Sequence, residues 1–162
     1  MKVVVISDTH IPERAEQLPT SFLEKAKDAD LILHAGDLAD ISVLSELKKI
    51  SKVVAVWGNM DSPEVKKTLK EKEIIKIEDI SIGLMHGRGH PNYLIKFLTE
   101  QFRSDAVDII IFGHSHKPMN KEIDDILFFN PGSLTDDFFS DYASFGVIEI
   151  KTGKYKAKIE KL

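Results

Sequence analysis

The sequence contains no cysteine. A thiol nucleophile, an iron–sulfur cluster, a zinc site with thiolate ligands and a disulfide are therefore all excluded. Because disulfides mark oxidising compartments, this absence also fits the reducing cytoplasm, and we expect a cytoplasmic protein.

Long hydrophobic runs are also missing. The first apolar run, residues 3–6, is interrupted by Ser7 and Asp8 and is too short for the core of a signal peptide. Later runs, such as residues 109–112, fall far below the roughly 20 residues that span a bilayer. We therefore expect a soluble protein that has no membrane partner.

The sequence also lacks an excess of positive charge. The chain has 22 Lys and Arg against 26 Asp and Glu, which gives a formal net charge of -4. A long nucleic acid requires a basic surface, so this composition argues against it as a substrate. The 162 residues, 43% of them hydrophobic, fit one globular domain that spans residues 1–162.

Apolar runs alternate with amphipathic segments through the first two thirds of the chain. The runs predict four buried strands, at residues 3–6, 31–33, 53–56 and 109–112. Helical spacing of apolar residues, and a serine followed by proline at 62–63, predict helices at residues 15–29, 41–50, 63–69 and 91–102. Strand–helix–strand alternation predicts an α/β fold with parallel strands.

Other segments alternate with a period of two. They lie at residues 74–77, 80–84, 145–150 and 155–159, and short turn sequences separate the members of each pair. This pattern predicts two antiparallel hairpins. Together with the parallel strands, it predicts two mixed sheets packed together with helices outside.

Seven polar side chains follow the ends of five predicted strands. They are Asp8, His10, Asp37, Asn59, His86, His114 and His116. Because the carboxyl ends of parallel strands form the crevice in which ligands bind, we expect these side chains to converge. Each motif alone is weak evidence, since Asp-x-His is also a common turn sequence, but five coincidences in order are improbable.

Imidazole and carboxylate ligands without thiolate point to a divalent transition metal, such as Mn, Ni, Fe, Co or Zn, with Mn or Ni favoured. Seven ligands exceed the needs of one ion that keeps an open position. Two ions that share a bridging carboxylate fit better, and such a pair can hold a bridging hydroxide for in-line attack on phosphorus.

The motif set resembles that of the calcineurin-like metallophosphoesterases, in particular the small phosphodiesterase branch that includes a retromer subunit. The resemblance extends from residue 3 to the Asn-Pro-Gly-Ser sequence at 130–133. It implies a four-layer α/β/β/α sandwich with two mixed sheets. It also implies that Asp37 bridges two metals, the first held by Asp8, His10 and His116 and the second by Asn59, His86 and His114.

One position departs from the family pattern. Met60 stands where many members have the histidine that protonates the leaving group. Asp61, Arg88 and His90 are candidate auxiliaries, but Asp61 could equally cap the helix after Pro63, and the other two could belong to a solvated loop. For His34 we favour a hydrogen-bonded core position or one directly behind the ligands.

The sequence therefore predicts a dinuclear metal-dependent phosphoesterase acting on a small phosphoester. The resemblance favours phosphodiesters over monoesters. The alternative is a non-catalytic interaction scaffold like the retromer subunit, which would have no need to retain four metal-facing histidines. The acidic charge argues against a nuclease, and a homo-oligomer remains open.

Overall fold

Two five-stranded mixed sheets form the centre of the computed structural model, which describes residues 1–136 and 138–162. The first sheet has the order β10-β9-β1-β2-β3 and comprises β1 (Lys2–Ile6), β2 (Leu31–His34), β3 (Lys52–Ala55), β9 (Ser144–Lys151) and β10 (Lys154–Lys161). The second has the order β4-β5-β6-β8-β7 and comprises β4 (Lys72–Ile77), β5 (Ile80–Met85), β6 (Ile109–Ile111), β7 (Met119–Ile123) and β8 (Ile126–Asn130).

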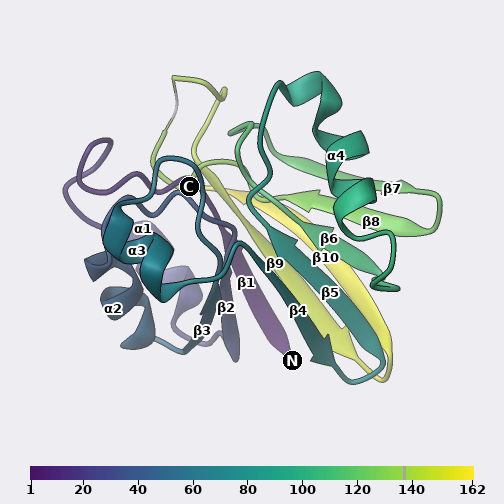
Figure 1. Ribbon diagram of the computed structural model, residues 1–162. Helices are drawn as coiled ribbons and strands as arrows, with labels where there is room; N and C mark the ends of the chain where they lie inside the picture. The colour runs from purple at the N-terminus through teal and green to yellow at the C-terminus, as the bar shows by residue number, and fades with distance from the viewer. Residues whose placement is uncertain (137) are drawn as a thin grey trace.

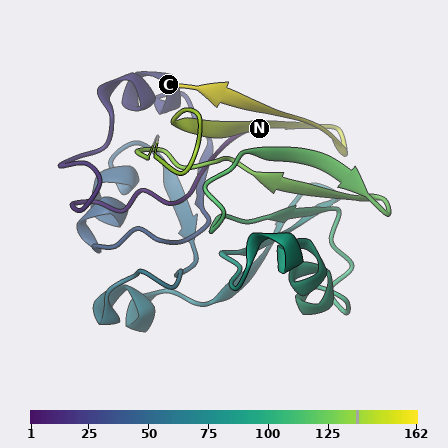
Figure 2. The same cartoon turned by 90° about the horizontal axis from the view of Figure 1, so that it is seen from above.

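Helices cover the outer face of each sheet (Figures 1 and 2). Those on the first sheet are α1 (Thr20–Ala26), α2 (Ser42–Lys48) and α3 (Pro63–Thr68). The second sheet carries a 3₁₀ turn, η1 (Pro91–Tyr93), followed by α4 (Leu94–Gln101). The predicted four-layer α/β/β/α sandwich is confirmed.

The period of two along each strand assigns its side chains to different layers. In β1, Val3 and Val5 pack between the two sheets, whereas Val4 and Ile6 pack against the helices of the outer layer. In the second sheet, Ile110 likewise faces the α4 layer. Strands buried on both faces explain why the sequence shows continuous apolar runs rather than alternation.

The structure corrects one prediction of local structure and adds a strand that was not predicted. The helix predicted at residues 15–29 comprises only Thr20–Ala26, because Pro19 occupies the N-cap position and the chain before it forms turns. Strand β7 was not predicted, because its central residues are polar and exposed at the edge of the sheet. In the turn from β7 into β8, both Asp124 and Asp125 have positive φ. The Asp-Asp pair was the available sequence signal, because aspartate is among the residues favoured in such tight turns.

Parallel pairing directs several strand ends to one edge of the molecule. Strands β1, β2 and β3 are parallel in the first sheet, and β5, β6 and β8 are parallel in the second. Their carboxyl ends lie toward the top of Figure 1. Within the described residues, no helix combines the length and the apolar character that a membrane crossing requires.

Candidate metal centre

The seven predicted side chains all stand on the loops after β1, β2, β3, β5 and β6. The side chains that approach most closely form two overlapping groups, each with ligand atoms within 4.8 Å of one another. One group is Asp8, His10 and His116, and the other is Asp8, Asp37 and His86. Asn59 and His114 form a separate pair, in which Asn59 Oδ1 lies 3.0 Å from His114 Nδ1.

In the first group, two imidazoles face one carboxylate. His10 Nε2 lies 3.2 Å from His116 Nε2, and Asp8 Oδ1 lies 3.3 Å from His116 Nε2. Two donors about 2.1 Å from one shared ion can be at most about 4.2 Å apart. These separations therefore suit three ligands of one ion.

In the second group, His86 faces two buried carboxylates. Its Nε2 lies 3.2 Å from Asp37 Oδ2 and 3.9 Å from Asp8 Oδ1. Its Nδ1 donates a hydrogen bond to the carbonyl of Ala35 at 2.7 Å, so a neutral ring presents the lone pair of Nε2 to the carboxylates.

The charges of this group are strongly coupled. Burial disfavours the charged form of His86, but the carboxylates of Asp37 and Asp8 outweigh burial and raise the pKa of His86 to about 9. Burial likewise disfavours charge on Asp37, yet its contact with His86 and the backbone amide of Met60 keep the pKa of Asp37 below its usual value. The two carboxylates thus stabilise a positive charge between them, which either a proton on His86 Nε2, 3.2 Å from Asp37 Oδ2, or a bound metal ion can supply.

Two buried atoms of the cluster lack a hydrogen-bond partner among the described residues, namely Asp8 Oδ2 and His86 Nε2. Leaving a buried polar atom unsatisfied costs about 1–3 kcal/mol. A divalent cation would satisfy both atoms, and the imidazole and carboxylate donors are of the kind that transition metals prefer. The residues present therefore fit the metals that the sequence predicts.

Backbone strain is concentrated in the same place. Five of the seven candidate ligands have positive φ, a conformation that is uncommon for residues other than glycine: Asp8 (51), His10 (41), Asp37 (57), His114 (68) and His116 (58). Such strain persists where the surrounding structure enforces it, typically at functional sites.

Two glycines allow the carboxylates to approach the backbone closely. A Cβ at Gly58 would lie 2.2 Å from Asp37 Oδ1, and a Cβ at Gly113 would lie 2.7 Å from Asp8 Oδ2. Larger residues at either position would displace a candidate ligand.

Several neighbouring side chains hold the loops rather than pointing at the cluster. Asp61 accepts hydrogen bonds from the backbone amides of Asp37, Ala39 and Gly58, at 3.0, 2.7 and 2.6 Å. It does not cap α3, because the Ser62 hydroxyl accepts from the Val65 amide instead. The helix-capping alternative for Asp61 was therefore wrong.

The Asn-Pro-Gly-Ser segment also holds the site from behind. Asn130 donates to the carbonyl of Gly113 at 2.8 Å, and the Ser133 hydroxyl donates to the carbonyl of Asp8 at 2.7 Å. His34 is fully buried, contacts the Thr9 hydroxyl at 3.1 Å and accepts from the Gly36 amide. As expected, it is a hydrogen-bonded histidine behind the ligands.

The glycine loop after β5 places its side chains outward. Arg88 Nη1 lies 4.0 Å from Glu71 Oε1, and the Arg88 guanidinium lies over the ring of Phe97. His90 accepts a hydrogen bond from the Asn92 amide. The loop contributes a backbone group instead, since His114 Nε2 donates to the carbonyl of Gly89 at 2.7 Å.

The cluster opens into a hollow of about 510 Å³. Besides candidate ligands, the hollow is lined by Glu13, Arg14, Met60 and Phe139, with the Arg14 guanidinium 5.5 Å from the centre of the Phe139 ring. Sequence reasoning did not single out Arg14, Asp136 or the role of Phe139, because no local motif marks them. Asp136 accepts a hydrogen bond from His116 at 2.9 Å.

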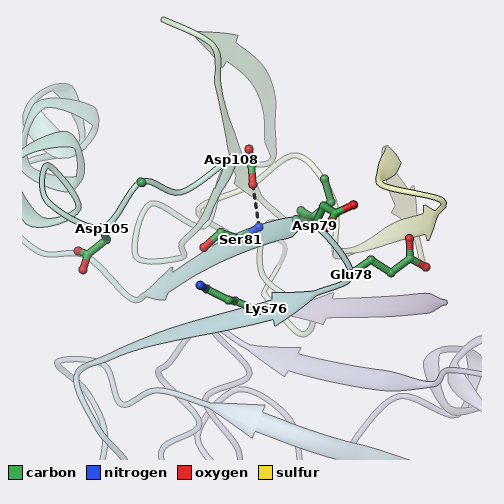
Figure 3. A pocket seen from close by; sticks show the side chains of 8 residues that line it. Lys76, Glu78, Asp79, Ser81, Asp105 and Asp108 are labelled. Atoms are coloured by element: carbon green, nitrogen blue, oxygen red, sulfur yellow. Dashed lines mark hydrogen bonds between the residues drawn. The ribbon is translucent and has the colours of Figure 1, made fainter.

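Another hollow lies at the amino ends of β5 and β6, far from this edge (Figure 3). Two of its carboxylates have other partners: Asp105 pairs with Lys72, and Asp108 accepts a hydrogen bond from the Ser81 amide. Within the described part of the chain, they do not converge on a common point as the candidate ligands do.

This geometry agrees with the comparison to known families. A model described as the calcineurin-like phosphoesterase superfamily domain matches residues 1–153. The chain belongs to this superfamily. The resemblance drawn from the strand-end motifs is thereby confirmed.

Individual members of the superfamily extend the comparison. A probable metallophosphoesterase of Methanothermobacter thermautotrophicus is 37% identical over 159 residues, covering 98% of this chain and 91% of that protein. Phosphodiesterase MJ0936 of Methanocaldococcus jannaschii is 25% identical, covering 96% of this chain and 97% of that protein. The crystal structure of wild-type Vps29 from Entamoeba histolytica in complex with zinc has a TM-score of 0.77 at 31% identity, covering 99% of each chain.

Proposed function

We propose that the protein is a metal-dependent phosphoesterase with a dinuclear centre. The observation that carries this proposal is the pair of overlapping ligand groups, which share Asp8 and bury two polar atoms without a partner among the described residues. When bound, two divalent ions would activate water as the nucleophile and neutralise charge on the phosphoryl oxygens.

The chain's own residues would divide between the two ions as the family pattern implies. Asp8, His10 and His116 would hold one ion, Asn59, His86 and His114 would hold the other, and Asp37 would contact both. The position of Asp37 supports its bridging role, since its Oδ2 lies 3.8 Å from His10 Nε2 and 3.2 Å from His86 Nε2. Arg14 adds a positive charge to the hollow in which an anionic substrate would bind.

A phosphodiester substrate is favoured over a monoester. The support is the branch resemblance together with the likeness to the phosphodiesterase of M. jannaschii over nearly the whole chain. Small phosphoesters fit the hollow of about 510 Å³ beside the ligands.

The proposal is tested by stripping the protein of metal and reloading it with Mn²⁺, Ni²⁺, Co²⁺, Zn²⁺ or Mg²⁺. Each form is assayed against matched phosphomonoesters and phosphodiesters, and its metal content is measured. We expect two ions per chain and faster hydrolysis of the diesters. Saturation at one ion would contradict the dinuclear centre, and inactivity of every metal form would contradict the phosphoesterase.

Asp37→Asn should be the most damaging conservative change at the site. Because Asp37 is assigned to both ions, its loss should weaken both metal sites and reduce kcat by about 10²-fold or more, on the order of a catalytic group's contribution. Asp40→Asn is the matched control, since Asp40 accepts only a local backbone hydrogen bond from Ser42 among the described residues. Substantial activity of Asp37→Asn with both ions bound would exclude the bridging role.

The second candidate function is a non-catalytic interaction scaffold. The likeness to Vps29 over 99% of each chain supports it. The same reloading experiment separates the two functions, because a scaffold would bind metal without hydrolysing any ester of the panel.

A further inference from the structure

A carboxylate outside the strand-end motifs contacts one of the candidate ligands. Asp136, in the loop after β8, is 3% exposed. Its Oδ2 accepts a hydrogen bond from His116 Nδ1 at 2.9 Å, and its Oδ1 accepts one from the Phe138 amide at 2.7 Å. Its own amide donates to the Ser133 hydroxyl, which in turn donates to the carbonyl of Asp8.

This hydrogen bond determines which nitrogen of His116 is free. A carboxylate only accepts hydrogen bonds, so the proton of a neutral His116 ring must lie on Nδ1. The lone pair then lies on Nε2, the atom that stands 3.2 Å from His10 Nε2 and 3.3 Å from Asp8 Oδ1. Asp136 thus directs the lone pair of His116 into the cluster.

The same loop also restrains the orientation of the ring. The Phe139 ring stands edge-on to the His116 ring, with centroids 5.6 Å apart and planes at 87°. His86 and His114 donate instead to backbone carbonyls, of Ala35 and Gly89. Within the described residues, His116 is the candidate histidine whose outward nitrogen meets a carboxylate.

We propose that Asp136 is a positioning residue for His116, which fixes its tautomer and ring orientation so that Nε2 faces a divalent metal ion. The inference rests on the proposed metal centre. Carboxylate partners of metal-binding histidines typically change metal affinity by about 10–100-fold. We expect a loss of that size when Asp136 is replaced by alanine.

The first test is nitrogen NMR of the metal-free protein, at a pH where His116 is neutral. The wild type should carry its proton on Nδ1, and Asp136→Ala should shift the population toward the Nε2–H form. Asp136→Asn retains an acceptor oxygen without the charge, so it should keep the wild-type tautomer. A wild-type His116 with its proton on Nε2 would overturn the proposal.

The second test is calorimetric titration with Mn²⁺. Asp136→Ala should lose about 10–100-fold in affinity at one site, and Asp136→Asn should lose less. Asp108→Ala is the matched control, because it removes a carboxylate that accepts a backbone hydrogen bond, from Ser81 at 2.7 Å, far from the cluster. Unchanged affinity in Asp136→Ala would refute the positioning role.

The outcomes separate this inference from the proposed function. A loss of Mn²⁺ affinity in a protein that hydrolyses no ester would support the positioning role and reject the enzyme. Ester hydrolysis by the wild type, together with full Mn²⁺ affinity in Asp136→Ala, would support the enzyme and reject the positioning role.

Discussion

Met60 and His34 lie close to the candidate ligands but in opposite environments. Met60 is 60% exposed and lines the hollow in front of the cluster, while its backbone amide donates to Asp37 Oδ1. His34 is fully buried behind the cluster. We therefore expect a change at Met60 to affect the reaction of a substrate in the hollow, and a change at His34 to affect the stability of the fold.

We predict that leaving-group departure limits the rate, because a thioether at position 60 has no proton to donate. A placed acid typically contributes about 10²–10⁴-fold. Hydrolysis should therefore be much faster for diesters with nitrophenyl leaving groups than for dialkyl diesters. Met60→His should accelerate the poor leaving groups selectively.

The measurement is kcat/KM against the pKa of the leaving group. Met60→Leu is the matched control and should keep the steep dependence of the parent, since it also lacks a proton. A flat dependence in the parent would contradict the prediction. If His90→Ala then made it steep, His90 would be the acid.

His34 should make the metal-free protein sensitive to acid. Burial, aided by the neighbouring His86 and opposed by Asp37, lowers the pKa of His34 from 6.5 to about 3. The unfolded chain binds this proton near pH 6.5, whereas the folded protein binds it only near pH 3. The contribution of His34 to stability is thus complete above pH 6.5. Between pH 6.5 and about pH 3 it falls as the pH decreases, by up to about 1.4 kcal/mol per pH unit.

Urea unfolding of wild type and His34→Gln across this window checks the prediction. The variant should lose stability less steeply as the pH falls, because its side chain does not titrate. His90→Gln, which removes an exposed histidine, serves as the control. Equal slopes for wild type and His34→Gln would contradict the prediction.

At the scale of elements, the tight turns after the strands position the ligands. Strand β6 ends at Ile111, and two residues later Gly113 allows the Asp8 carboxylate to reach the His114 amide, with Asp8 Oδ1 accepting at 3.2 Å. The turn after β3 uses Gly58 in the same way toward Asp37. The positions of Asp8 and Asp37 therefore each depend on a glycine in another loop.

Gly113→Ala should reduce metal affinity by more than about tenfold, because its Cβ would stand 2.7 Å from Asp8 Oδ2 and 2.9 Å from Ser7 Cβ. Gly153→Ala is the contrasting variant: Gly153 lies in the turn between β9 and β10, its φ is +69, and the atom nearest its Cβ would be Asp79 Oδ2 at 3.3 Å. It should cost about 1–2 kcal/mol of stability from backbone strain yet preserve metal affinity. Titration with Mn²⁺ together with urea unfolding distinguishes the two, and equal metal affinities would contradict the argument.

At the scale of the whole molecule, the candidate centre joins the two sheets. Asp8, His10, Asp37 and Asn59 follow strands of the first sheet, and His86, His114 and His116 follow strands of the second. Elsewhere the sheets meet through apolar packing, in which Val3, Val5, Ile82 and Ile109 take part. Hydrogen bonds also cross between the sheets, such as the one that Asn120 donates to the carbonyl of Ala157 at 2.8 Å. A bound metal would add further directional bonds between the two layers.

Metal binding should stabilise the folded protein measurably. At a free metal concentration 100 times Kd, the gain is about 2.7 kcal/mol, or roughly 5–10 °C in Tm for a chain of this size. Calorimetric melting with and without Mn²⁺ measures the shift. Asp37→Ala should remove most of it, because Asp37 is the residue assigned to both ions. An unchanged wild-type Tm at saturating Mn²⁺ would contradict the linkage.

The sequence by itself determined the layers and the strand ends. Buried strands require continuous apolar residues, and polar residues at their ends interrupt those runs. Both the strands and their ends can therefore be recognised from short segments of the sequence. The seven candidate ligands could therefore be selected from the order of residues along the chain. The short edge strand β7 was missed because exposed polar residues carry no such pattern.

Only the tertiary structure decided which groups surround the ligands. Asp136 meets His116 across 20 residues of sequence, and Asp61 meets the Asp37 amide across 24. It also placed Asp8 in both candidate ligand groups, a closeness that no strand-end motif indicates. Such pairings depend on which strands are neighbours in a sheet, on how the two sheets pack and on how the loops turn back. No spacing along the chain encodes a hydrogen bond between distant segments.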